Sequence, residues 1–373
     1  MRKLLLIFIS FIILLTSCGG ADTGNSYAED YEFLWKTLEE SYPYYSYLEE
    51  SGLDLNEIKE RYSNKVESVD DFRDNITAMF AEMGNFAHLN VVTPELFRSY
   101  YYIYVQGTDE QSPFRDVLTD ERLADMYDID EERPQEKSSA LPKPQVLYYD
   151  DGKIIYLEIP TFAQEVSERD KNILSDALRE HPDAENIIID ITKNTGGSDY
   201  YWVNNLVAPL GKQYEFSFRS FLKSSEITDS YYAGAELQDV SDMDVPEWVE
   251  TCNLDKCFIS NWTVPEEGFQ PEKDVKVWVL TSDNVFSASD KFACFCKSTG
   301  FATIVGTQTS GDGLGSTPVL VLLPYSGVLV RFSAMAGENP DGSMNAREGT
   351  KPDILCGPTE DAFNKCIAII RGE

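Results

Sequence analysis

Apolar side chains in the first hundred residues recur at intervals of three and four, which is the spacing of an amphipathic helix. This spacing predicts a helix over residues 27–42, ahead of a proline, and a second, shorter helix over residues 55–62. A third helix is expected to start at Ser68, whose hydroxyl can cap it, and to end at Gly84. We therefore predict a small helical N-terminal unit over residues 27–95.

The period changes to that of β-strands after residue 145, where runs of β-branched and aromatic residues alternate with amphipathic segments. The predicted strands cover residues 146–149, 153–159, 186–191, 275–281 and 302–306, and the predicted helices cover residues 167–181, capped by Ser167, and 287–298. A late β-hairpin is predicted at residues 319–323 and 327–333. Strands and helices in this order, with short connections, are typical of an α/β core.

Two segments lack a clear period. Residues 96–145 are rich in charge and proline, and they are predicted to be an irregular linker. Residues 213–270 are acidic and aromatic, and they interrupt the α/β pattern. This second segment is expected to be either a lid over a site or a simple excursion from the core.

The N-terminal residues have the three regions of a secretory signal: a basic start, an apolar run over residues 4–15, and small residues before Cys18. The apolar run is too short to span a bilayer as a stable helix. A small pair directly before a cysteine looks like a bacterial lipobox, so residues 1–17 are expected to be removed and Cys18 to be lipidated. The alternative is an ordinary signal peptide with a chance cysteine. With residues 18–26 as a tether, the chain is predicted to be an exported bacterial lipoprotein of the cell envelope, anchored only through its lipid.

The composition narrows the possible partners. A formal charge of −33 argues against nucleic acid, because phosphate binding depends on Lys and Arg. Six further cysteines in an exported chain permit disulfides without fixing their pairing. These are Cys252, Cys257, Cys294, Cys296, Cys356 and Cys366. A zinc site is disfavoured, because the spacings do not repeat a Cys-x-x-Cys pattern and the chain has two histidines. We therefore expect no metal.

Ser287 lies where a predicted strand gives way to a predicted helix. The first turn of a helix has unpaired backbone N–H groups and the positive end of the helix dipole, which together can stabilise an oxyanion. The structural alternative is that Ser287 only caps the helix. Another strand end carries Asn194, Gly196 and Gly197, where glycines let the backbone approach a ligand closely.

Together, the Asp-x-x-x-Asn-x-Gly-Gly run over residues 190–197 and the Ser-Ala-Ser-Asp run that starts at Ser287 resemble the tail-specific (C-terminal-processing) protease family. The resemblance implies that Ser287, rather than Ser289, is the nucleophile. It also implies an oxyanion hole made by the backbone N–H of Gly197, with that of Gly196 as the alternative, together with the N–H of Ala288. Asn194 and Gly313 are then expected to line the site.

The family has two branches, which activate the serine differently. One branch uses a lysine in a Gly-rich loop, and here Asp312 stands in that place and cannot act as an amine base. The other branch, similar to the tricorn core protease, uses a histidine from the N-terminal helical unit and a late glutamate. The resemblance therefore implies His88 as the base and Glu348, in a Glu-Gly-x-x-Pro-Asp run, as its orienting partner, with Asp312 lining the site. Ala87 stands where the Ser-His form of this branch has a serine.

The resemblance also implies a crotonase-like (ClpP/crotonase-type) α/β core, with residues 146–373 as the catalytic domain. Many relatives carry a PDZ insert, but the irregular stretch over residues 106–145 is too short to hold one, so we expect none here. The implied activity is that of a serine-type endopeptidase or peptidase, which hydrolyses a peptide or protein substrate through an acyl-enzyme without a cofactor. Two alternatives stay open. One is a catalytically weakened relative that binds peptides or apolar ligands in the same cleft, and the other is an esterase with the same triad.

Overall fold

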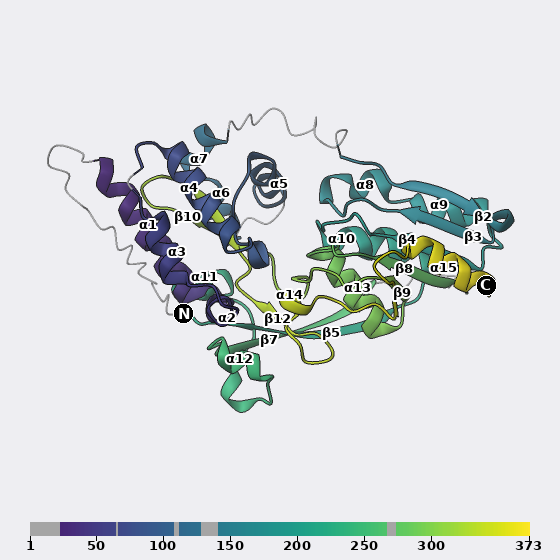
Figure 1. Ribbon diagram of the computed structural model, residues 1–373. Coiled ribbons are helices and arrows are strands. Elements are labelled where there is room, and N and C mark those ends of the chain that lie inside the picture. Colours follow the sequence, from purple (N-terminus) through teal and green to yellow (C-terminus); the bar gives the residue numbers. More distant parts are fainter. Residues whose placement is uncertain (1–22, 65, 108–111, 128–140, 267–273) are drawn as a thin grey trace, which may run out of the picture.

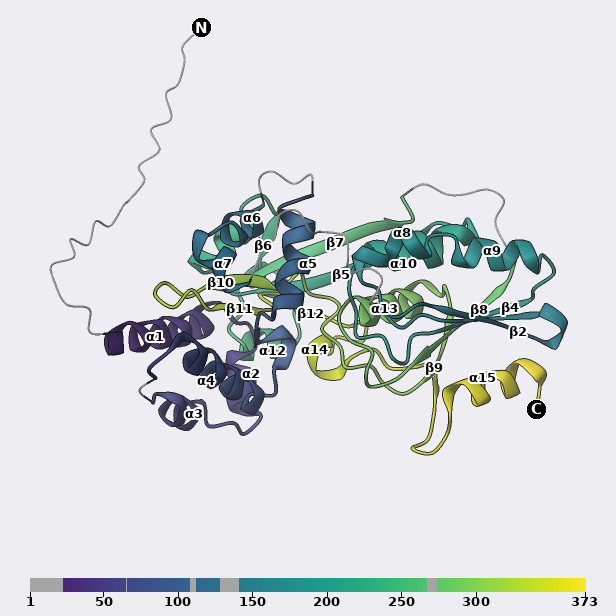
Figure 2. The ribbon, with the colours of Figure 1, turned by 90° about the horizontal axis from the view of Figure 1, so that it is seen from above.

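The computed structural model describes residues 23–64, 66–107, 112–127, 141–266 and 274–373. The predicted signal segment and Cys18 lie outside the described residues. Within these ranges, every helix is too short or too polar to cross a membrane. Figures 1 and 2 show most of the N-terminal helices at one end of the molecule and a six-stranded sheet with its own helices at the other.

The six-stranded sheet confirms the predicted α/β core. Its strands, in spatial order, are β13 (Ile354–Leu355), β9 (Thr303–Gly306), β8 (Lys276–Thr281), β4 (Asn186–Asp190), β3 (Ile154–Glu158) and β2 (Gln145–Tyr149). Only the β2–β3 pair is antiparallel, and the other four pairs are parallel. The carboxyl ends of β4 and β8 therefore meet at one edge, and both candidate motifs follow those ends.

Alternate residues along the central strands face two different helical layers. Ile187 and Ile189 of β4 pack toward the layer that contains α9 (Ile173–Glu180), α10 (Asp199–Trp202) and α13 (Ala288–Thr299). Ile188 packs on the other face with residues of α15 (Ala362–Arg371). Because both faces are covered, the strands read as continuous apolar runs, as expected for a parallel sheet.

The predicted N-terminal helices are present as α1 (Thr23–Ser41), α2 (Tyr45–Glu50), α3 (Leu55–Tyr62) and α4 (Val69–Glu82). Ser68 caps α4, since its side chain accepts a hydrogen bond from the backbone N–H of Asp71. α1 starts four residues earlier than predicted, inside the expected tether. These helices share one core with the strands of the late hairpin.

The range 96–145 contains more regular structure than predicted: α5 (Pro94–Tyr104), α6 (Pro113–Leu118) and α7 (Glu121–Met126). The last two have six residues each, which is too short for a helical period to show. Their start signals were nevertheless present. Thr93, Ser112 and Asp120 each accept a hydrogen bond from a backbone N–H in the first turn of the helix that follows.

The predicted late hairpin is confirmed as β10 (Val319–Leu322) and β11 (Leu329–Phe332). A short strand, β1 (Asn90–Val91), adds to it antiparallel to β11. This pairing fixes the chain directly after His88 against β11. The N-terminal helical region and the C-terminal part of the chain thus meet at the candidate base.

The described part of the range 213–270, residues 213–266, contributes three of the four strands of a third sheet. In spatial order its strands are β12 (Ala336–Gly337), β5 (Tyr214–Leu222), β7 (Lys256–Val264) and β6 (Leu237–Asp239), accompanied by α11 (Glu226–Tyr231) and α12 (Glu247–Thr251). Phe216 of β5 packs in the core of the six-stranded sheet, and Phe221 packs in the core of the N-terminal helices. Figure 2 shows β5 and β7 running between the two ends of the molecule.

Other details differ from the predictions. The helix expected over residues 167–181 is divided into α8 (Ser167–Asp170) and α9, and Ser167 accepts a hydrogen bond from Asn205 instead of capping it. The six described cysteines are free and buried. The remaining short elements are η1 (Phe86–His88), η2 (Asp150–Gly152), η3 (Gln164–Val166), η4 (Val203–Val207), η5 (Ala208–Leu210), η6 (Val240–Asp242) and α14 (Asn345–Glu348).

Candidate active site

Ser287 occupies a strained turn between β8 and α13. Its backbone has φ 59° and ψ −129°, which is uncommon for a residue with a side chain. Its N–H donates to the carbonyl of Gly311 at 2.9 Å. Although Ser287 is at the N-cap position, its hydroxyl makes no capping hydrogen bond. The simple capping interpretation is therefore not supported, and the hydroxyl stays available to the cleft.

Ser289, the neighbouring serine, has a different environment. It is fully buried, and its Oγ lies 2.7 Å from the carbonyl oxygen of Asn194. Ser289 Oγ also accepts a hydrogen bond from the N–H of Phe286 at 3.2 Å. Ser289 thus joins the two strand-end motifs and lies away from the cleft.

Glycines allow the two motifs to approach each other. A Cβ atom on Gly196 would lie 2.9 Å from the Cβ of Ser287, which is too close for any side chain. A Cβ on Gly197 would lie 2.3 Å from the carbonyl carbon of Phe162. On the other side, a Cβ on Gly313 would lie 2.6 Å from the carbonyl oxygen of Ser287. The backbone at Ser287 is therefore enclosed by positions that only glycine can fill.

The hydrogen bonds distinguish between the two glycines of the strand-end motif. Asn194 is fully buried, and its Oδ1 accepts from the N–H of Gly196 at 2.9 Å. That N–H is therefore already used. For the N–H groups of Gly197 and Ala288, no acceptor is found in the part of the chain that the structure describes.

His88 is held in an unusual loop. Asn85, Ala87 and His88 all have positive φ values, of 47°, 49° and 60°. Tyr42 donates to the carbonyl of Phe86 at 2.7 Å, and Ser333 donates its backbone N–H to the carbonyl of Ala87 at 3.0 Å. These contacts hold the loop in a backbone conformation that costs about 1–3 kcal/mol per strained residue.

The ring of His88 is buried and lies against the ring of Phe286. Its centroid lies 4.5 Å from that of Phe286, the residue before Ser287. Among the described residues, no hydrogen bond joins the Ser287 hydroxyl to the ring. Burial lowers the pKa of His88 below its ordinary value of 6.5, the charge of Asp312 opposes that shift, and Arg331 adds to it.

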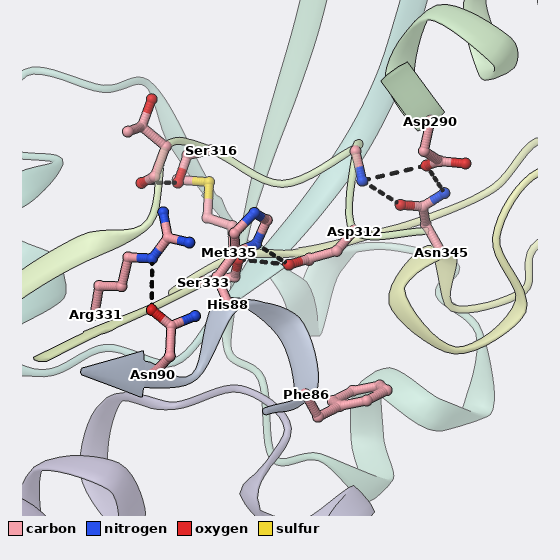
Figure 3. A network of polar contacts seen from close by, with 12 residues as sticks. Phe86, His88, Asn90, Asp290, Asp312, Ser316, Arg331, Ser333, Met335 and Asn345 are labelled. Atoms are coloured by element: carbon pink, nitrogen blue, oxygen red, sulfur yellow. Dashed lines mark hydrogen bonds and ion pairs between the residues drawn. The ribbon is translucent and has the colours of Figure 1, made fainter. Parts of the chain in front are cut away.

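The carboxylate that contacts His88 belongs to Asp312 and not to Glu348. Asp312 Oδ2 lies 2.5 Å from His88 Nδ1, and both side chains are buried (Figure 3). Asp312 reaches this position because its backbone has φ 56°, in the Gly-rich loop between β9 and β10. Glu348 lies on α14, partly exposed, with its Oε1 3.2 Å from Arg347 Nε. The sequence resemblance implied a carboxylate beside the histidine. The structure has one there, but it is Asp312, and no hydrogen bond or ion pair joins Glu348 to His88 among the described residues.

Two hydroxyls complete the surroundings of Asp312. Ser333 Oγ donates to Asp312 Oδ2 at 2.8 Å and lies 3.2 Å from His88 Nδ1. Tyr44 Oη donates to Asp312 Oδ1 at 3.3 Å. A serine thus does contact the histidine, although it comes from the end of the hairpin and not from position 87. Spacing along the sequence gave no signal for either hydroxyl, because both reach the site through the tertiary fold.

Asp290 fixes the loop that carries Asp312. It is fully buried on the first turn of α13 and accepts hydrogen bonds from Thr309 Oγ1 at 2.5 Å, Thr350 Oγ1 at 2.8 Å and Asn345 Nδ2 at 2.8 Å. Asn345 and Asp290 also accept from the N–H of Gly313, at 2.9 and 3.2 Å (Figure 3). This network joins the helix that begins after Ser287 to the loop that ends at Gly313.

Asp290→Ala is expected to lower the free energy of unfolding by roughly 3 kcal/mol, because it leaves several buried donors without an acceptor. Urea denaturation followed by circular dichroism measures the change. Asp283→Ala removes an exposed carboxylate from the loop before the same helix and should change stability by less than about 0.5 kcal/mol. Equal denaturation midpoints for the two variants would contradict the structural role of Asp290.

These residues line one cleft of about 1040 Å³, whose walls include Ser287, His88, Asp312, Gly197 and Ala288. Gly196 and Gly313 also line it, so seven of the predicted site residues are brought together, whereas Asn194 and Glu348 are not among the lining residues. Lys291 also lines the cleft, and its Nζ lies 2.7 Å from Asp199 Oδ2, with which it forms an ion pair. No group of three or more His, Cys, Asp or Glu side chains that could hold a metal ion is found among the described residues.

Comparison with known proteins identifies the family. Solved structures with the same fold include a candidate peptidase from Parabacteroides merdae (17% identity, TM-score 0.57, covering 93% of this chain and 96% of that one). Mature CPAF is 13% identical, with a TM-score of 0.55, and the match covers 90% of this chain and 93% of that one. A lipoprotein from Streptococcus agalactiae is 14% identical, with a TM-score of 0.53, and the match covers 93% of this chain and 96% of that one. No curated protein matches significantly. The model of peptidase family S41 matches residues 153–356, more than half of the chain, and the protein therefore belongs to this family of serine peptidases.

Proposed function

We propose that the protein hydrolyses peptide bonds through an acyl-enzyme at Ser287, with His88 as general base and Asp312 as the carboxylate that orients it. The observation that carries this proposal is the pairing of His88 Nδ1 with Asp312 in the cleft that Ser287 lines. With Nδ1 donating to the carboxylate, Nε2 of the neutral ring has a free lone pair. This nitrogen can accept the proton of the serine.

The proposed reaction begins when His88 Nε2 takes the proton from Ser287 as its Oγ attacks the substrate carbonyl. Rotation of the serine side chain about χ1 has to bring Oγ to the ring, since catalytic hydrogen bonds are often not formed in the free enzyme. The N–H groups of Gly197 and Ala288 then donate to the oxyanion, at the positive end of the α13 dipole.

The tetrahedral intermediate collapses when the imidazolium of His88 donates its proton to the leaving amine. Asp312 stabilises the imidazolium, and Ser333 and Tyr44 hold the carboxylate through their hydroxyls. Water then attacks the acyl-enzyme with His88 again acting as base, and Ser287 is regenerated.

Digestion of a proteome-derived peptide library tests the proposed reaction, with new peptide ends identified by mass spectrometry. We expect the purified chain without its signal segment to produce new ends that a Ser287→Ala variant does not produce. Hydrolysis of p-nitrophenyl esters without any new peptide ends would instead indicate an esterase. Peptide retention without cleavage of either substrate would indicate a binding protein.

We further propose that the protein is exported and anchored through a lipid on Cys18. The first described helix begins at Thr23, so the anchor would lie within a few residues of the folded chain. Cys18→Ala is expected to move the protein from the membrane pellet to the soluble fraction of the producing cells, because the lipid is the proposed anchor. Fractionation followed by a carbonate wash measures the distribution. Retention of the variant on washed membranes would contradict the lipid anchor.

A further inference from the structure

We propose that Arg331 binds a carboxylate of the peptide substrate and so determines which peptides the cleft accepts. This inference rests on the proposed peptidase function and concerns the same cleft. Arg331 lines that cleft together with Ser287 and His88.

The position of Arg331 is fixed by strand pairing. It lies on β11 directly opposite Asn90 of β1, which follows His88 by two residues. It also precedes Ser333 by two residues, and side chains two apart on an extended strand share one face. Two extended residues span about 7 Å, so the backbone of Arg331 lies about that far from Ser333, whose hydroxyl contacts His88. Figure 3 shows Arg331 and Asn90 beside His88.

The guanidinium of Arg331 is fixed by hydrogen bonds to uncharged side chains. Its Nε donates to Asn90 Oδ1 at 2.9 Å and its Nη1 donates to Tyr100 Oη at 3.2 Å. Both partners are uncharged, and no carboxylate lies within 4.0 Å of the guanidinium in the described ranges. These two contacts fix the side chain and leave Nη2 uncommitted.

Arg331 lacks a carboxylate partner among the described residues although the chain has 64 acidic and 31 basic residues. The other cation that lines the cleft, Lys291, is paired with Asp199. Elsewhere, Arg219 is paired with Glu338 through two hydrogen bonds. An acidic protein repels anionic peptides in general, so a fixed local cation is required if the cleft is to accept one.

The chemistry of a guanidinium defines the ligand. Arg presents N–H donors in a planar fork that matches a carboxylate, and charge-assisted hydrogen bonds of this kind are about twice as strong as neutral ones. Arg331 is partly buried, which strengthens the interaction further. The carboxylate can come from the C-terminus of the substrate or from an Asp or Glu side chain.

The test uses matched peptides that the wild-type chain cleaves. One pair differs only in a C-terminal acid or amide, and a second, amidated series replaces Asn by Asp at each position in turn. We expect wild type to favour one carboxylate-bearing peptide over its neutral partner by about 10- to 100-fold in kcat/KM. The pair that shows the preference identifies the source of the carboxylate.

In Arg331→Gln this ratio should fall to near one, whereas Arg331→Lys should keep part of it. Arg347→Gln removes an exposed arginine outside the cleft and should keep the wild-type ratio. Equal rates for both members of every pair in wild type, or an unchanged ratio in Arg331→Gln, would overturn the proposal. Thermal denaturation of each variant shows whether it is folded.

A binding measurement separates this proposal from the proposed function. If wild type cleaves no peptide, fluorescence anisotropy with labelled peptides measures the affinity of the intact chain directly. Tighter binding of carboxylate peptides that is lost in Arg331→Gln would support the anion site even though hydrolysis had failed. Equal affinities for acidic and neutral peptides would overturn it independently of catalysis.

Discussion

Ser287→Ala is expected to lower kcat/KM for a cleaved peptide by about three to six orders of magnitude while leaving the fold intact. The large loss follows from removing the atom that forms the acyl-enzyme. The small effect on stability follows from the structure, in which the Ser287 hydroxyl makes no capping hydrogen bond. Initial rates of peptide cleavage and thermal denaturation measure the two effects separately.

Ser289→Ala is the matched control, because it removes a hydroxyl two residues away on the same helix. Ser289 is buried and bonded to the strand-end motif, so we expect a loss of about 1–2 kcal/mol of stability and a much smaller loss of activity. An active Ser287→Ala together with a folded but inactive Ser289→Ala would transfer the nucleophile to Ser289.

His88→Ala should reduce kcat/KM nearly as much as Ser287→Ala, because the serine is a poor nucleophile without its base. Residues that act as a unit are not additive, so the Ser287→Ala/His88→Ala double variant should be hardly slower than either single variant. Double-mutant kinetics measure this coupling. Losses that multiply in the double variant would show that His88 does not act on Ser287.

The carboxylate partner can be tested by a pair of isosteric variants. Asp312→Asn keeps the shape of the side chain but removes the charge that fixes the tautomer of His88, and we expect a loss of about 10²- to 10⁴-fold. Glu348→Gln should have only a small effect, since Glu348 contacts Arg347 and not the histidine. The opposite order of effects would restore the assignment that the sequence resemblance suggested.

The pH profile supplies an independent readout of the same base. His88 must be neutral to accept a proton, so kcat/KM should fall as the pH drops through the pKa of His88. Burial lowers that pKa, so activity should persist below pH 6.5 before it falls. Asp312 raises the pKa, so the acid limb should move to lower pH in Asp312→Asn. Arg331 lowers it, so the limb should move to higher pH in Arg331→Gln.

The fold could be predicted largely from local patterns. Continuous apolar runs such as that of β4 specified buried parallel strands, and the Ser68 cap marked the start of α4. The segment 96–145 was underestimated because its helices α6 and α7 are shorter than two turns and are stabilised by packing against the late hairpin. Tertiary packing of that kind leaves no period in the sequence.

The candidate site was predictable only in part. The sequence motifs and their resemblance to the family led to Ser287, Gly197 and His88. Gly197 lies between β4 and α10, Ser287 directly before α13, and His88 in η1. The sequence did not predict which carboxylate would contact His88. Asp312 reaches the histidine because its backbone has a positive φ, whereas Glu348, on α14, contacts Arg347. Ser333 and Arg331 depend on the pairing of β11 with β1, whose two residues are too few to predict.

The central claim is that Ser287 is a nucleophile activated by His88, and covalent labelling tests it most directly. A fluorophosphonate probe reacts with an activated serine, and mass spectrometry of the digested protein locates the label. We predict a single adduct on Ser287 in wild type, no adduct in Ser287→Ala, and strongly slowed labelling in His88→Ala. A folded wild-type protein that takes up no label, or takes it up at another serine, would contradict the account.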